Sequence, residues 1–161
     1  MDRFTAAVVA SGCTVGTSAA GDLADLEIKE GAVASAQALV DYPWLADIAK
    51  RPDPSPLTTF DQGVITGELG IAETGSILVV ENEIEDRLVS MMSEHLIVLV
   101  RAETVEESLD AAEVWFSEVP STPSYAVLLT GPSRTADIER SLTIGVQGPS
   151  STKVVIVGEQ S

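Results

Sequence analysis

The sequence contains one cysteine, one histidine and nine basic residues among its 161 residues. Cys13 and His95 alone exclude an internal disulfide, a structural zinc site of the Cys/His type and a four-thiolate iron–sulfur site within the chain. The Asp-rich pattern of a calcium-binding loop is also missing from the sequence. We therefore assign no metal to this chain and expect any redox centre to lie on a partner protein.

Basic residues are outnumbered by 25 acidic ones, which gives a formal net charge of −16. Such a surface repels the phosphates of nucleic acids and anionic membranes, so we expect no nucleic-acid partner. The longest apolar runs, such as residues 96–100, are far shorter than the roughly 20 residues of a membrane-spanning helix. The N-terminus has no basic start with a long apolar stretch, so the sequence predicts a cytoplasmic protein without membrane insertion.

Short β-rich runs alternate with helical patterns, which is typical of an α/β fold with a mostly parallel sheet flanked by helices. We predict one domain over residues 1–161. Strands are expected at residues 13–16, 32–34, 63–66, 76–80, 96–101, 125–130 and 153–157, with 63–66, 76–80 and 96–101 in the centre of the sheet. Helices are expected at residues 2–11, 35–40, 44–50 and 105–118, and the last has a capping-box spacing from Thr104 to Glu107.

A glycine-bearing loop at residues 70–76 precedes a predicted strand, where open α/β sheets usually bind ligands. Gly75 permits backbone conformations closed to other residues, Thr74 and Ser76 offer hydroxyls, and Glu73 places a carboxylate among small neighbours. A glutamate in this setting can act as a nucleophile or as a general base. Alternatively, Glu73 caps backbone amides in a tight turn, and the spacing leaves both interpretations open.

A second loop, at residues 131–139, follows the strand predicted to end at Thr130. A helix beginning around Thr135 would bring its free amides together with the Ser133 hydroxyl and the Arg134 guanidinium, which suits a phosphate or a carboxylate. The candidate ligand-binding residues of this loop are Gly131, Ser133, Arg134, Thr135 and Asp137. In the alternative interpretation, Arg134 only neutralises Asp137 or another carboxylate near the start of that helix.

Two further polar residues stand beside predicted strands or glycines. His95 precedes the strand at 96–101 and is a candidate general base or ligand contact, or else a hydrogen-bonded residue at the strand boundary. Gln147 lies between glycines in residues 145–149, where it is a candidate ligand contact or shapes the loop. The common dinucleotide, P-loop and hydrolase-elbow patterns do not occur in the sequence.

Six motifs follow one another along the chain in an order that is similar to that of a known family. They are residues 65–66, the loop at 70–76, Arg87 with Ser90, residues 95–98, the block at 131–139 and residues 145–149. Over residues 61–157 this order resembles the lactate utilization protein C family, the LUD domain. The resemblance implies a NagB/RpiA/CoA-transferase-like α/β fold. It also implies a part in the oxidation of L-lactate to pyruvate, alongside partner proteins that carry iron–sulfur clusters.

The sequence departs from that family at two points. The family has a histidine where this chain has Gln147, and an amide can hydrogen-bond but does not titrate near neutrality. The region before the motifs is also shorter than the helical region of the family. A binding or assembly role is therefore easier to support than full catalysis.

In similar CoA transferases a glutamate in a glycine-containing loop is the nucleophile, and Glu73 resembles it at the level of the fold. We expect Glu73, Thr74 and Ser76 to face Ser133 and Arg134 across a cleft that binds a small carboxylate or phosphate. The leading interpretation is an accessory component of a lactate-oxidising system. The alternatives are a free-standing enzyme of the CoA-transferase or sugar-phosphate-isomerase kind, and a non-catalytic metabolite sensor.

Overall fold

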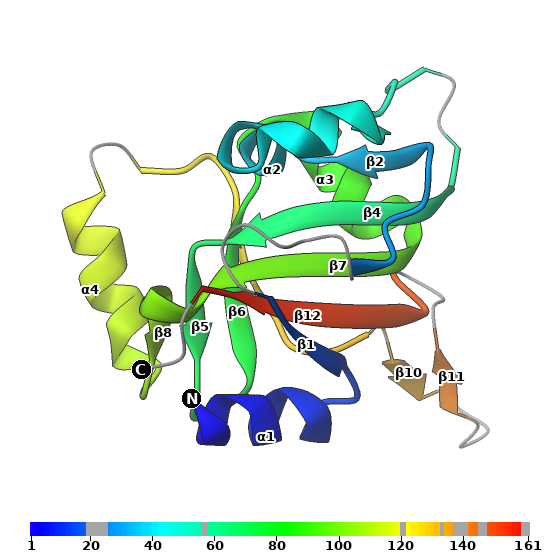
Figure 1. Cartoon of the computed structure of the whole chain (residues 1–161). Helices are drawn as coiled ribbons and strands as arrows, with labels where there is room; N and C mark the ends of the chain where they lie inside the picture. Colours follow the sequence, from blue (N-terminus) through cyan, green and yellow to red (C-terminus); the bar gives the residue numbers. More distant parts are fainter. Residues whose placement is uncertain are drawn as a thin grey trace.

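The computed structural model describes residues 1–18, 26–55, 58–119, 122–132, 134–136, 142–144 and 148–158, with backbone only for 134–136 and 142–144. Its largest element in this part of the chain is a six-stranded sheet of order β1-β12-β7-β4-β2-β3, in which every pair is parallel (Figure 1). The strands are β1 (Thr14–Ser18), β2 (Ala32–Ala34), β3 (Ala49–Lys50), β4 (Phe60–Gly67), β7 (Ser93–Arg101) and β12 (Ser151–Val157). The prediction of an α/β fold with a mostly parallel sheet is confirmed.

Strand β7 lies inside this sheet, between β12 and β4, and both of its faces are covered. Leu96, Val98 and Val100 belong to the hydrophobic cluster on one face of the sheet. Ile97 and Leu99 belong to the cluster on the other face. Because successive side chains point to opposite faces, a strand covered on both sides needs an unbroken apolar run.

One face of the large sheet is covered by α2 (Ala36–Asp41) and by η2 (Pro43–Asp47), a 3₁₀ helix. The Ser35 hydroxyl caps α2 by accepting the amide of Ala38, so the helix predicted at 35–40 begins one residue later, at Ala36. The helix predicted at 44–50 is wrong at its C-terminal end. Ala49 pairs with Ala32 of β2, so residues 49–50 extend the sheet instead of the helix.

A second sheet, of order β8-β5-β6-β9, packs beside the first. It consists of β5 (Leu69–Ile71), β6 (Ser76–Val80), β8 (Val105–Glu106) and β9 (Ala126–Leu129), and β6 runs antiparallel to both of its neighbours. The prediction that 76–80 is a central strand of the main sheet is therefore wrong, because β6 pairs with β5 and β9. The strand predicted at 125–130 is confirmed as β9, which is half-buried to exposed.

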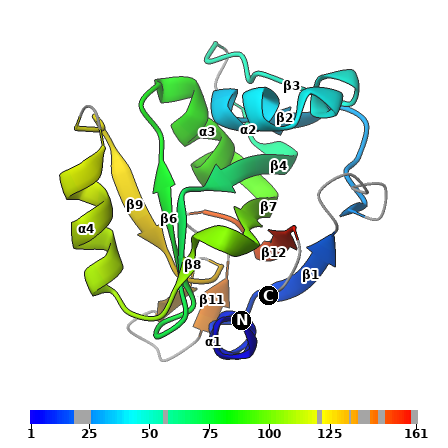
Figure 2. The same cartoon turned by 60° about the vertical axis from the view of Figure 1, so that its left-hand side comes forward.

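The other face of the large sheet is covered by α1 (Asp2–Ala10), α3 (Ile84–Met92) and the second sheet. Helix α4 (Asp110–Glu118) covers the outer face of the second sheet, where Ala112 packs with Leu69 and Leu78 (Figure 2). Among the described residues, no helix combines the length and apolar character that crossing a bilayer requires.

The predicted start of the helix at 105–118 is wrong. Thr104 ends a 3₁₀ turn, η3 (Ala102–Thr104), and its hydroxyl donates to the Arg101 carbonyl at 3.1 Å instead of capping a helix. Val105 then pairs with Gly70, so residues 105–106 form β8 and the helix begins at Asp110.

The helix expected from Thr135 is also wrong. The backbone forms β10 (Arg134–Ala136), which pairs antiparallel with β11 (Leu142–Ile144). Because the amides of β10 take part in strand pairing, the anion site built from free helix amides does not form at this position.

Candidate functional site

The end of the first predicted ligand loop lies beside the start of the second, at one end of the second sheet. Ile77 of β6 pairs with Leu129 of β9, which places Ser76 next to Thr130. The hydroxyl oxygens of Ser76 and Thr130 are 2.6 Å apart, and the Thr74 hydroxyl donates to Ser76 Oγ at 2.8 Å. A chain of three hydroxyls therefore joins the first loop to the residue that precedes Gly131.

Helix α1 supports both loops through two glycines. Gly75 and Gly131 have φ angles of +68° and +79°, a region that favours glycine. A Cβ at Gly75 would come within 2.5 Å of the Ala7 carbonyl carbon, and one at Gly131 within 2.4 Å of the Ser11 carbonyl oxygen. Both glycines are thus required by close approach to the helix as well as by their own backbone angles.

A cavity of about 240 Å³ opens beside the junction of the loops. Its polar wall contains Ser90 of α3, Thr130 with Gly131, and Gly148. Its apolar wall contains Val79, Met91, Val127, Leu129 and Pro149, and Tyr125 adds an aromatic ring with a hydroxyl. Three motifs that are distant in the sequence, at 87–90, 131–139 and 145–149, therefore contribute residues to one cavity.

Glu81 also lines this cavity, and the sequence analysis did not identify it. Only 1% of the residue is exposed, and neither carboxylate oxygen has a hydrogen-bond partner among the described residues. Burial raises the pKa of Glu81, and the nearby Asp86 raises it further, although the Ser90 hydroxyl and the Arg87 guanidinium oppose the shift. Its sequence signal is an acidic residue directly after the buried strand β6.

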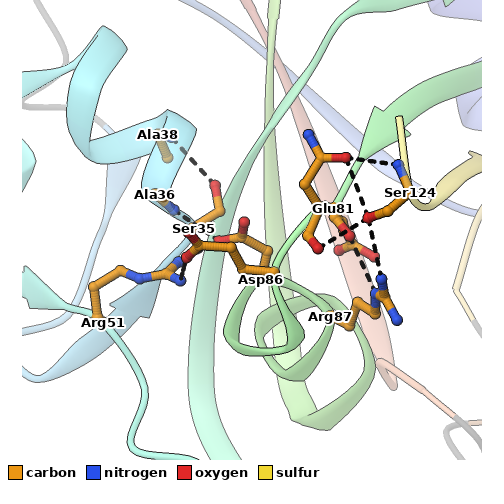
Figure 3. Close-up of polar contacts among 10 residues, drawn as sticks. Ser35, Ala36, Ala38, Arg51, Glu81, Asp86, Arg87 and Ser124 are labelled. Carbon is orange, nitrogen blue, oxygen red and sulfur yellow. Dashed lines mark hydrogen bonds and ion pairs between the residues drawn. The ribbon is translucent and has the colours of Figure 1, made fainter. Parts of the chain in front are cut away.

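Arg87 fixes the surroundings of Glu81 on one side, as Figure 3 shows. Its Nε donates to the backbone carbonyl of Glu81 at 3.1 Å, and its guanidinium lies 4.7 Å from the centre of the Tyr125 ring. Because Tyr125 lines the cavity, Arg87 places a positive charge against one residue of the cavity wall.

Glu73 lies outside this cavity lining. Its side chain is exposed, and its Oε2 accepts the backbone N–H of Leu109 at 3.2 Å, directly before α4. This contact agrees with the capping interpretation of Glu73. The Arg134 side chain lies outside the described part of the structure, so the cleft expected between Glu73 and Arg134 remains a prediction.

Replacing Glu73 with alanine is expected to lower the free energy of unfolding by about 1 kcal/mol, because α4 loses a charged acceptor at its N-terminus. Glu73→Gln keeps an acceptor oxygen and should lose less. Urea denaturation followed by circular dichroism measures both changes. Glu113→Ala, an exposed substitution within α4, serves as the control. Equal stability of Glu73→Ala and the wild type would show that the Leu109 contact contributes nothing.

His95 lies within β7, not before it. It lines a different cavity from the one at Glu81. Its Nδ1 is 2.8 Å from the Ser151 hydroxyl oxygen, and its Nε2 is 4.0 Å from Asp61 Oδ1. It lines a cavity of about 530 Å³ that shares no residue with the one at Glu81. Its predicted catalytic role is therefore separate in space from the loop residues.

Asp61, Glu94 and His95 each have a potential ligand atom within 4.8 Å of the others, so they are the residues of the described chain that could hold a metal ion together. Asp61 already accepts a hydrogen bond from the Lys29 ammonium at 2.7 Å, and this contact lowers the pKa of Asp61. A metal ion would compete with that ammonium for the Asp61 carboxylate, and we assign no metal here.

Several predicted ligand residues cannot be placed around the cavity. Ser133, Asp137 and Gln147 lie outside the described residues, and Arg134 and Thr135 are described only through the backbone of β10. The residues that the structure brings together are Thr74, Ser76, Thr130 and Gly131.

The profile of the LUD domain matches residues 7–157 of this chain. The chain belongs to the LUD domain family. This match begins well before residue 61, where the resemblance in the sequence motifs begins. The N-terminal helix that supports both loops is therefore partly inside the LUD domain.

Curated relatives of this LUD domain carry names that refer to lactate. Lactate utilization protein C 1 of Bacillus mycoides is 30% identical over 104 residues, which cover 62% of this chain and 44% of that protein. Lactate utilization protein C of Oceanobacillus iheyensis is 29% identical over 101 residues, which cover 60% of this chain and 43% of that protein. The matched segment thus spans less than half the length of these relatives.

A solved structure shares the fold. The crystal structure of a DUF162 family protein from Deinococcus radiodurans matches with a TM-score of 0.62 and 16% identity, covering 98% of this chain and 95% of the other. At this identity the similarity establishes the arrangement of sheets and helices in the LUD domain.

Proposed function

We propose that this LUD domain is an accessory component of a system that oxidises L-lactate to pyruvate, and that it binds a small carboxylate in the cavity beside Thr130 and Gly131. The names of the curated relatives support the link to lactate. In this proposal the iron–sulfur clusters that receive the electrons belong to partner proteins, since the chain has a single cysteine.

The observation that carries the proposal is the convergence of three separated motifs on one cavity. Ser90, Gly131 and Gly148 come from different segments, yet all three line it. Loops that carry polar residues on a rigid scaffold are common places for binding sites. The predicted ligand residues Ser133 and Arg134 follow Gly131 closely in the sequence, and Gln147 directly precedes Gly148.

The size and lining of the cavity suit a short-chain acid. A volume of about 240 Å³ is below the usual range for drug-sized ligands, so a three-carbon acid is a better fit than a whole nucleotide or coenzyme A. The aliphatic walls accommodate a methyl group. Ser90, Thr130 and the amide of Gly131 can hydrogen-bond oxygen atoms.

The free-standing CoA-transferase alternative depends on Glu73 as a nucleophile. In this structure its carboxylate is bound by the Leu109 amide, outside the cavity lining. The geometry therefore favours a binding role over covalent catalysis by Glu73.

Isothermal titration calorimetry with L-lactate and with pyruvate tests the proposal. The expected result is saturable binding of at least one acid, with about tenfold weaker binding in Thr130→Val, because this variant keeps the shape of the side chain and removes its hydroxyl. Thr59→Val, at an exposed position before β4, is the matched control and should bind like the wild type.

An accessory role also predicts that the pure chain does not oxidise L-lactate when an artificial electron acceptor is supplied. Turnover by the chain alone would contradict the accessory role. Absence of saturable binding of both acids would contradict the assignment of the ligand.

A further inference from the structure

Among the described residues, Glu81 is the buried ionisable side chain that lacks a hydrogen-bond partner. Both of its carboxylate oxygens are inaccessible and have no hydrogen-bond partner among the described residues. A buried carboxylate without partners is strongly disfavoured relative to its neutral acid form. Glu81 also lines the cavity with Ser90 and Thr130, which makes a ligand in this cavity the candidate partner for its carboxyl group.

We propose that Glu81, as a neutral carboxylic acid, donates a hydrogen bond to the carboxylate of a small 2-oxo or 2-hydroxy acid bound in this cavity. This inference rests on the proposed function and names a residue that determines which ligands the site accepts. A protonated carboxyl group is a strong donor to an anion, whereas an ionised one repels it. Among the described residues that line the cavity there is no lysine or arginine, so in this proposal Glu81 supplies a donor to the carboxylate.

Of the two charged side chains around Glu81, Asp86 favours the neutral state and Arg87 opposes it. Asp86 on α3 adds negative charge, which opposes ionisation of Glu81. Arg87 on the same helix is committed to the Glu81 backbone carbonyl, to Ser124 at 3.5 Å and to the Tyr125 ring. Ser90 donates its hydroxyl to the Arg87 carbonyl at 3.1 Å. On the β9 side, the Tyr125 carbonyl accepts the backbone amide of Glu81 at 3.0 Å.

This arrangement couples ligand binding to a proton. Ordinary carboxylic acids are ionised above about pH 5. The charge of lactate and of pyruvate is therefore constant over the pH range of the experiment, roughly pH 5.5 to 8.5. Loss of the Glu81 proton as the pH rises removes the donor and adds a like charge. Above the pKa of Glu81, affinity should fall by up to about tenfold for each pH unit.

The experiment is calorimetry with pyruvate and with L-lactate at several pH values, on the wild type and on Glu81→Gln. The amide of glutamine keeps an N–H donor and is neutral throughout. In the wild type we expect affinity to decline once the pH exceeds the pKa of Glu81 in the free protein, and binding at those pH values to take up a proton, measured by repeating the titration in buffers of different ionisation enthalpy. Glu81→Gln should bind with pH-independent affinity and no proton uptake.

Two control variants separate this effect from other titrations. Glu113→Gln makes the same chemical change on the exposed side of α4, and His95→Gln removes the histidine from the other cavity. Both should keep the pH dependence of the wild type. Loss of that dependence in His95→Gln would overturn the assignment to Glu81.

The remaining outcomes distinguish this inference from the proposed function. Saturable binding that is independent of pH in the wild type, or identical pH profiles in the wild type and Glu81→Gln, would overturn the role of Glu81 while the ligand assignment stands. Failure of the wild type to bind either acid at any pH would overturn both. Circular dichroism of Glu81→Gln establishes that the variant is folded before the comparison is made.

Discussion

Replacing Gly75 with alanine is expected to lower the free energy of unfolding by roughly 2–5 kcal/mol. The residue has a φ angle of +68°, which is strained for any side chain with a Cβ. The added methyl group would also lie 2.5 Å from the Ala7 carbonyl carbon and 2.6 Å from the Val8 amide nitrogen. Because these are backbone atoms of α1, the helix has to move to relieve the clash.

Gly31→Ala is the matched control for Gly75→Ala. Gly31 has a similar φ angle, +84°, but a Cβ built there meets no atom within 4 Å. It should lose about 1–2 kcal/mol from backbone strain alone. Chemical denaturation of both variants therefore isolates the contribution of contact with α1. If the two variants were equally stable, the close packing of the loop on the helix would be refuted.

Replacing Asp86 with alanine is expected to lower the free energy of unfolding by about 3 kcal/mol. The carboxylate of this nearly buried residue accepts the amide of Ala36 at the start of α2, at 2.8 Å, and binds the Arg51 guanidinium (Figure 3). It thereby connects α3, α2 and the proline-rich segment after β3. Its removal leaves an amide and a partly buried guanidinium without this acceptor.

Glu83→Ala provides the comparison for Asp86→Ala, because Glu83 binds the same Arg51 side chain at 2.9 Å but is exposed. An exposed ion pair contributes at most about 1 kcal/mol. Asp86→Asn, which retains an oxygen for the Ala36 amide, should fall between the two. Thermal and urea denaturation measure the series. A loss in Glu83→Ala as large as that in Asp86→Ala would contradict the importance of burial.

The central strands of the large sheet could be predicted because a strand buried on both faces is a continuous apolar run in the sequence. Residues 96–100 and 154–157 are apolar on both alternating faces, which is the requirement for a strand covered on both sides. The same pattern at 76–80 predicts a strand equally well, but it cannot indicate which sheet the strand joins. The turn from β5 into β6 makes these two strands antiparallel neighbours, and β6 pairs with β9 on its other side.

The start of α4 shows how one local pattern fits two structures. Thr104 and Glu107 have capping-box spacing, but Val105 and Glu106 pair with β5 and become strand. Helix α3 was missed altogether, although its residues Arg87 and Ser90 were recognised in the family motif. The family motif therefore drew attention to Arg87 and Ser90, whereas the helical periodicity of residues 84–92 was too weak to predict a helix.

The candidate site was predictable in part. Adjacent loops at the ends of strands account for the contact between Ser76 and Thr130, which joins the two predicted motifs. Glu81 was missed because its significance lies in the absence of partners around it, and no spacing rule encodes this. Glu73 was placed in the right loop, but only tertiary structure reveals that its carboxylate is turned toward the start of α4.

The shared support of two loops by α1 makes residues 75 and 131 interdependent. A larger residue at either position pushes the same helix outward, at Ala7 and Val8 in one case and at Ser11 in the other. Once the first substitution has displaced the helix, the second meets a space that is already open. The two penalties are therefore subadditive, and the double substitution should cost less than the sum of the two single substitutions.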